Sequence, residues 1–355
     1  MAQNRADEAK AVLSTGLASN PENQGIHFDL FWVSAALGDE AGMQRELQWA
    51  SGKLAGVNLL GVAATARAAY LGKLKSAREL STQALQIARE NNFKDSGAGV
   101  AAFEALLEAE VGNFGQARER AAASLALSRT RTNLPAIAVT LALAGDSKQA
   151  QGIVDELHRR YPVDTVANDV FIPCAQALLE SNRGDPAQGI QALQVASRYE
   201  LGPVYSFLPI YVRGLIYLHA RKGQQAAAEF QRILNYRALG EIVPAYALSY
   251  VGLARAYALT GDSAKSRKLI RTSSHSGKMP TLTFPSLRKL RPSTRSCSKP
   301  PGKSAVFPIR ERMEKKSIRI TYRFTASVIY KPSSPQSGLT LIHFQVSALC
   351  HASSA

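Results

Sequence analysis

LARAYALTGDSAKS, residues 253–266, contains the parts of one helix–turn–helix unit. Leu253 and Tyr257 are four residues apart, so they lie on one face of a first helix. Gly261 ends that helix, because glycine adopts the left-handed conformation of a C-terminal cap at little cost. Ser266 follows five residues later and is small enough for a second helix to cross the first closely. The stretch therefore predicts an antiparallel helix pair.

The combination of a turn glycine and a small residue five positions later recurs along the chain. It occurs at Gly72 with Ala77, Gly112 with Ala117, Gly145 with Ala150, Gly184 with Gly189, Gly223 with Ala228 and Gly261 with Ser266. Earlier turns are expected at Gly38 with Gly42 and at Asn4 with Ala9. From Gly38 onward the turn glycines are 34, 40, 33, 39, 39 and 38 residues apart. This spacing predicts helical repeats that stack into a solenoid, with the small alanines buried at the helix crossings.

The repeat resembles the tetratricopeptide repeat (TPR), a helix–turn–helix unit of 34 residues. The resemblance implies an all-α, right-handed solenoid of antiparallel helix pairs over residues 1–268. About seven pairs are expected, with a truncated first repeat that indicates a fragment of a longer protein. One helix is predicted over 4–19. Helix pairs are predicted over 22–52, 57–91, 96–128, 133–160, 166–197 and 205–236, with a kink or late start at Pro173.

Three short blocks carry a more specific resemblance. YPVDT (161–165), LPIYVRG (208–214) and AEFQRIL (228–234) are similar to the TPR region that follows the catalytic domain in some bacterial serine/threonine protein kinases. This resemblance implies a sensory or scaffolding region of a signalling protein. The chain contains no HRD or DFG motif and no glycine-rich phosphate loop after a strand, so kinase activity is not carried over. The alternative is a kinase fragment whose catalytic domain is encoded upstream.

The positive charge of the chain is concentrated in its last quarter. The whole sequence has 43 Lys and Arg, 27 Asp and Glu and a net charge of +16. Residues 269–355 contain 15 of the basic residues and 2 of the acidic ones, which leaves residues 1–268 with 28 and 25. We expect a disordered basic tail over 269–355. Nucleic-acid binding through this tail is a third hypothesis, and no specific nucleic acid is expected for the repeat region.

A change of reading frame near Lys268 would also explain the tail. With suitable codons, residues 269–299 read in the shifted frame as YQDFLTLWKDADPDIPIPEEATAEYEKLQ, followed by a stop codon. This peptide is acidic, has Phe, Leu and Trp at helical spacing, and resembles the end of the kinase-associated TPR regions. We therefore expect a frameshift, in which case residues 269–355 lack the cap that a solenoid needs.

No chemical motif indicates catalysis or a cofactor. The six histidines are scattered, and the three cysteines, Cys174, Cys297 and Cys350, are far apart, so neither a metal site nor a disulfide framework is expected. No apolar run reaches the roughly 18 residues of a membrane-spanning helix. The N-terminus reads as a charged amphipathic helix start and not as a signal peptide. These features favour a non-enzymatic, cytoplasmic protein.

Binding is the activity that the repeats favour. In a TPR superhelix the first helix of each pair lines a concave groove. Aligning Tyr217 and Tyr257 as inner tyrosines places Tyr211, His219 and Arg255 on the groove side. Tyrosine and arginine often anchor interfaces, so we predict that a peptide or protein partner binds in the groove.

Overall fold

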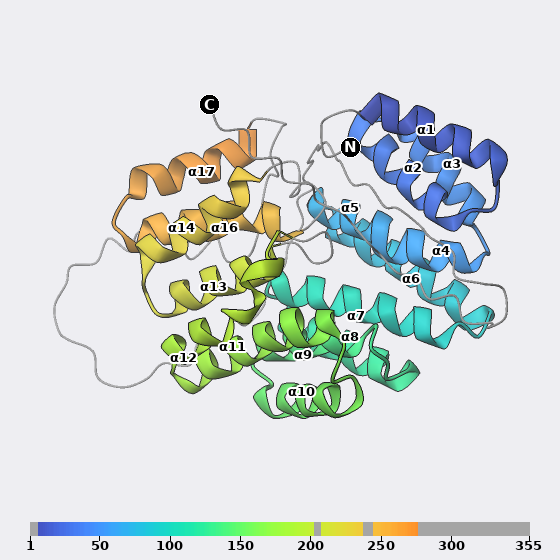
Figure 1. Cartoon of the computed structure of the whole chain (residues 1–355). Helices are drawn as coiled ribbons and strands as arrows, with labels where there is room; N and C mark the ends of the chain where they lie inside the picture. The colour runs from blue at the N-terminus through green and yellow to red at the C-terminus, as the bar shows by residue number, and fades with distance from the viewer. Residues whose placement is uncertain (1–5, 202–206, 237–243, 276–355) are drawn as a thin grey trace, which may run out of the picture.

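The computed structural model describes residues 6–201, 207–236 and 244–275, and this part of the chain is helical and contains no strand (Figure 1). A single helix, α1 (Ala6–Ser19), comes first and packs on α2. In the first pair, α2 (Gln24–Leu37) packs with α3 (Glu40–Ala50). The first helix of the second pair has three segments, α4 (Leu54–Asn58), η1 (Leu59–Ala64) and α5 (Thr65–Tyr70), and its second helix is α6 (Leu74–Glu90). In the third pair, α7 (Lys94–Glu110) packs with α8 (Phe114–Leu127).

Four more pairs follow within the described residues. In the fourth pair, α9 (Leu134–Leu143) is followed by α10 (Ser147–Arg160). The fifth pair has η2 (Ala167–Phe171) and α11 (Ile172–Arg183) as its first helix, and α12 (Pro186–Ala192) and η3 (Val195–Tyr199) as its second. The sixth pair is α13 (Leu208–His219) with α14 (Gly223–Asn235), and the seventh is α16 (Pro244–Leu259) with α17 (Ser263–His275). The predicted all-α class and helix pairing are therefore confirmed, with bounds within a few residues of those expected.

One turn chemistry joins the two helices of most pairs. Six of the predicted turn glycines have positive φ, from 66° at Gly72 to 95° at Gly184, as a left-handed cap requires. In four turns the next residue is an aspartate whose carboxylate accepts a backbone N–H of the second helix: Asp39, Asp146, Asp185 and Asp262. The Gly-Asp dipeptide thus ends one helix and caps the next.

The turn predicted at Gly223 is wrong by two residues. The left-handed position there is taken by Arg221, with φ 56°, and Gly223 is instead the first residue of α14. A Cβ on Gly223 would lie 2.9 Å from the carbonyl oxygen of Ala256, so the glycine permits a close helix contact. As a consequence the small residue at the crossing is Ala226, which is fully buried, and the predicted Ala228 is exposed.

The other predicted crossing residues are buried. Ala77, Ala117 and Ala150 have at most 1% of their surface exposed. At Gly189 a Cβ would lie 2.6 Å from the carbonyl oxygen of Ala177, closer than any side chain tolerates. Small residues are thus required where the second helix of a pair crosses the first.

Two first helices contain a π-helical segment. In the second pair η1 separates α4 from α5, and the Thr65 hydroxyl donates to the carbonyl oxygen of Leu60 at 2.8 Å. In the fifth pair η2 directly precedes α11, whose second residue is Pro173. The irregularity expected at Pro173 therefore takes the form of a π turn, which suits a residue that has no N–H to donate.

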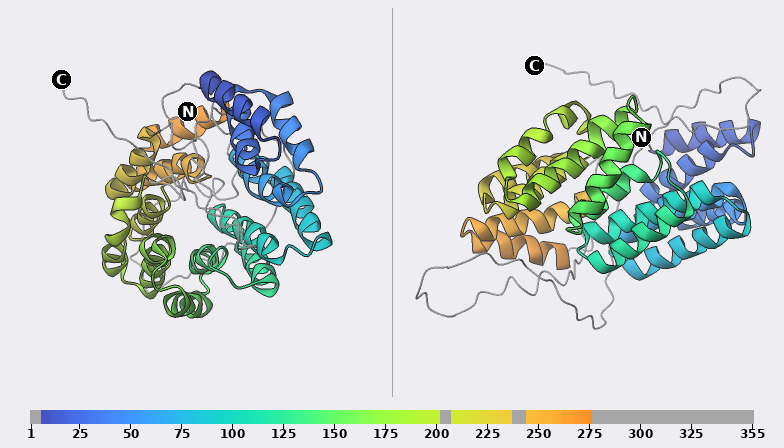
Figure 2. Two further views of the ribbon diagram at one scale, coloured as in Figure 1. Left: turned by 45° about the vertical axis from the view of Figure 1, so that its right-hand side comes forward. Right: turned by 90° about the horizontal axis from the view of Figure 1, so that it is seen from below.

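The first helices of successive pairs contact one another in chain order, and the pairs are arranged around a common centre (Figure 2). Helix α7 contacts α9, α9 contacts α11, α11 contacts α13, and α13 contacts α16. Nearly every residue of α9, including Ile137 and Val139, is buried. One apolar core is centred on α9 and α11, and a second joins α2, η1 and α5 to α13, α14 and α16.

The predicted domain boundary at Lys268 falls inside a helix. Helix α17 continues to His275, and Leu269 packs against the second apolar core. The remainder of the predicted tail, residues 276–355, and the turn expected at Asn4 lie outside the described residues. No helix in the described part is long and apolar enough to cross a membrane.

Candidate functional site

The predicted groove residue Tyr211 is a packing residue. Its side chain is 5% exposed and lies edge-on to Phe230 of α14, with ring centroids 5.9 Å apart. The tyrosine therefore belongs to the second apolar core and does not offer its ring to a ligand. The helical pattern places Tyr211 on a first helix but does not show that α14 covers it.

Arg255 of α16 and Glu110 of α7 lie close enough to Tyr211 to influence its ionisation. Burial is the main cause that raises the pKa of Tyr211, the charge of Glu110 adds to it, and the charge of Arg255 opposes it. Both charged side chains retain partial exposure. The structure thus places two of the predicted residues, Tyr211 and Arg255, near an acid that the sequence prediction missed.

Glu110 is the last residue of α7, where the partial negative charge of the helix end disfavours a carboxylate. Burial raises its pKa to about 8. A glutamate at a helix C-terminus, two residues before the turn glycine Gly112, is the sequence signal that could have identified it.

His219 does not join this group. It is exposed at the C-terminal end of α13, and its Nδ1 lies 3.0 Å from the hydroxyl oxygen of Ser181 in α11. The contact links the ends of two neighbouring first helices. The three predicted residues therefore occupy two separate places.

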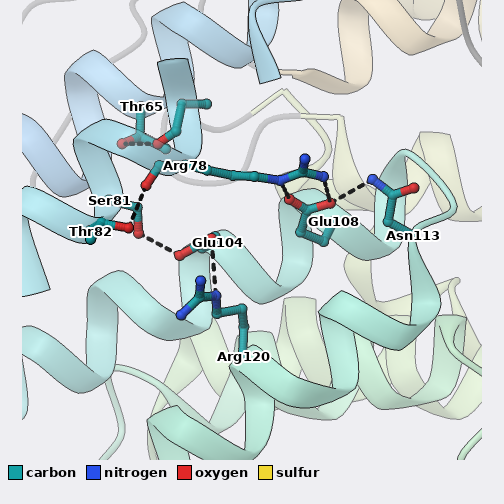
Figure 3. Close-up of polar contacts among 9 residues, drawn as sticks. Thr65, Arg78, Ser81, Thr82, Glu104, Glu108, Asn113 and Arg120 are labelled. Atoms are coloured by element: carbon teal, nitrogen blue, oxygen red, sulfur yellow. Dashed lines mark hydrogen bonds and ion pairs between the residues drawn. The ribbon is translucent and has the colours of Figure 1, made fainter. Parts of the chain in front are cut away.

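A buried polar network connects α6, α7 and α8 (Figure 3). Glu108 of α7 is 1% exposed. Arg78 of α6 donates to both carboxylate oxygens of Glu108, from Nε at 2.5 Å and from Nη2 at 2.9 Å. The side-chain amide of Asn113 donates to the same carboxylate at 2.7 Å. Three charge-assisted hydrogen bonds thus compensate the burial of the Glu108 carboxylate.

Glu104 lies one turn earlier on the same face of α7 and is also 1% exposed. The Ser81 hydroxyl donates to it at 2.6 Å, and Arg120 of α8 forms an ion pair with Nε 3.1 Å from Oε1, without the alignment of a hydrogen bond. Burial is the main cause that raises the pKa of Glu104, and Ser81 and Arg120 oppose it. The network therefore fixes three helices in register, and each acid in it has a partner.

A surface cleft of about 430 Å³ lies between α1 and α3, above α2. Its lining includes Lys10, Leu17, Pro21, Leu30, Arg45 and Glu46. Beside it the buried His27 connects both walls, because its Nδ1 lies 2.5 Å from Glu46 and its Nε2 lies 2.8 Å from the carbonyl oxygen of Pro21. The His27 ring stacks on Trp49, with centroids 3.4 Å apart. The two basic side chains of the lining, Lys10 and Arg45, both pair with Asp39, and one wall of the cleft is fixed by His27.

The described part of the chain holds no group of three His, Cys, Asp or Glu placed to bind a metal ion. Cys174 is fully buried, and burial raises the pKa of its thiol well above the usual range. No family model matches the sequence, and no curated protein and no solved structure matches it either.

Proposed function

We propose that this chain is a non-catalytic protein-interaction region, built as a right-handed TPR-like solenoid, and that it binds a peptide or protein partner through its first helices. The observation that carries the proposal is the repetition of one helix-pair geometry. The same left-handed turn and buried small residue recur from Gly38 to Gly261. Stacked helix pairs of this kind create long surfaces for partners and need no catalytic group.

Arg255 is the best candidate contact on this surface. It is partly exposed on a first helix, and no ion pair with an acid compensates its charge among the contacts of the described residues. The buried Tyr211, which packs on Phe230, lies near enough for the charge of Arg255 to lower its pKa. A partly desolvated arginine beside a rigid aromatic core is typical of residues that contribute most to binding.

The cellular setting follows from the resemblance alone. We propose a cytoplasmic signalling protein of bacterial origin in which this region provides a scaffold or a sensor; the alternative is a kinase fragment whose catalytic domain is encoded upstream. The nucleotide sequence upstream of the codon for Met1 tests this part. An open reading frame with HRD and DFG motifs in the same frame supports a kinase fragment, and a stop codon directly upstream contradicts it.

Site-specific photo-cross-linking tests the interaction surface. A photoreactive phenylalanine analogue replaces Leu259, which is 36% exposed and lies four residues after Arg255 on the same face of α16, so that Arg255 is kept. As a control it replaces Lys75 on α6, whose side chain is 91% exposed. In a lysate of the source organism, we expect one discrete cross-linked protein from position 259 and none from position 75. Equal cross-linking from both positions, or cross-linking from position 75 alone, contradicts the proposed surface.

A further inference from the structure

The last helix pair contacts pairs that are far from it in the sequence. In a stack of repeats each unit touches only its neighbours. Here α16 packs against α13, its neighbour, and also against α5 of the second pair and α7 of the third. The array is therefore closed on itself, because its seventh pair meets its second and third.

The apolar core has the same connectivity. Tyr70 of α5, with 1% of its surface exposed, belongs to one cluster with Tyr246 of α16, which is 4% exposed. Phe103 of α7 and Val111, which directly follows α7, are partly buried and pack against the same cluster. The middle of the chain, from α9 to α11, contributes to the other cluster instead. The contact of α16 with α5 and α7 thus bypasses α9 to α11, which lie between them in the sequence.

Phe230 makes the last two pairs one rigid body. Its ring lies where a Cβ on Gly214 of α13 would be 2.8 Å away and a Cβ on Gly252 of α16 would be 2.5 Å away. Two first helices therefore pack on one ring of α14, and neither can move past it without losing a buried contact. A displacement of α13 and α14 is transmitted directly to α16.

We infer that α16 is a latch that holds the array closed through α5 and α7, so that the seventh pair and the second and third pairs open and close as one cooperative unit. Glu110 of α7 and Arg255 of α16 both lie near the buried Tyr211 of α13. The latch rests on the proposed function in one respect: a partner that binds along the first helices must compete with α16 for the faces of α5 and α7. Opening of the latch then regulates access to this surface.

Hydrogen exchange of the full chain without a partner tests the latch. The substitution Gly252→Ala overpacks the contact with Phe230 and loosens α16 without touching α5. We expect amide exchange to become about tenfold faster in α16 and also in Thr65–Tyr70, while Leu134–Leu143 keeps its protection. Val251→Ala is a milder variant of the same helix for use if Gly252→Ala does not fold, since Val251 is 6% exposed.

A matched control perturbs the middle of the array. Ile153→Val in α10 removes one buried methyl group and should accelerate exchange in α9 and α11 without changing α5 or α16. If Gly252→Ala or Val251→Ala accelerates α13, α14 and α17 but leaves Thr65–Tyr70 as in the unaltered chain, the latch is wrong. Because no partner is present, this result is independent of whether the proposed function is correct.

Discussion

Arg78 and Glu108 form a two-pronged ion pair between helices α6 and α7, although they are 30 residues apart in the sequence. The carboxylate is almost completely buried, whereas 29% of the arginine side chain is exposed. Hydrogen bonding to Glu108 is the main cause that raises the pKa of Arg78. The pair thus lets the inner helix α7 carry a charge that it could not bury alone.

The first prediction concerns this pair. Arg78→Ala should lower the free energy of unfolding by about 3 kcal/mol, because the buried Glu108 carboxylate keeps only Asn113 as a partner. Urea denaturation measures the change. Lys75→Ala is the control: its pair with Glu79 is exposed, with atoms 3.6 Å apart, and its loss should change stability by less than about 0.5 kcal/mol. Equal effects of the two substitutions would show that Glu108 does not depend on Arg78.

The second prediction tests the corrected register of the sixth pair. Ala226→Leu should destabilise the protein by about 1–3 kcal/mol, because the fully buried site has no room for three more carbon atoms. Ala228→Leu, two residues later on the exposed face, should leave the melting temperature nearly unchanged. A lower melting temperature for Ala228→Leu than for Ala226→Leu would support the turn at Gly223 and contradict the turn at Arg221.

The sequence predicts the helix pairs well, because apolar periodicity and Gly-Asp turns are local signals. It fails at Arg221, where a residue other than glycine adopts the left-handed conformation and no local pattern indicates it. Sequence reasoning also missed the partners of Glu104 and Glu108, since Ser81, Arg78 and Arg120 come from other helices. For the candidate site, the sequence could not show the burial of Tyr211, which depends on a second helix, and Arg255 stays a prediction.

The third prediction concerns pH. Asp29 of α2 is 6% exposed, and burial raises its pKa from 3.8 to about 7. The raised pKa means that the folded state binds a proton more tightly than the unfolded state. The resulting stabilisation is complete below pH 3.8 and is lost as the pH rises through about 7.

Asp29→Asn removes this dependence because the amide is neutral at every pH. The variant should be more stable than the unaltered chain by about 4 kcal/mol at pH 8.5, since the folded protein no longer holds a buried charge. The two proteins should have similar stability near pH 4, where Asp29 is mostly protonated in the folded state and about half protonated in the unfolded state. Chemical denaturation at both pH values measures the difference. A gap of the same size at both values would show that Asp29 does not titrate between them.

We propose that the partner binds on the first helices of the pairs. Once cross-linking identifies the partner, fluorescence polarisation with a labelled segment of it gives the dissociation constant. Arg255→Glu should weaken binding about tenfold or more, because it reverses the charge of the central contact. Lys75→Glu on α6 should leave the dissociation constant unchanged. Unchanged binding by Arg255→Glu together with a loss in Lys75→Glu would place the partner on the second helices and contradict the account.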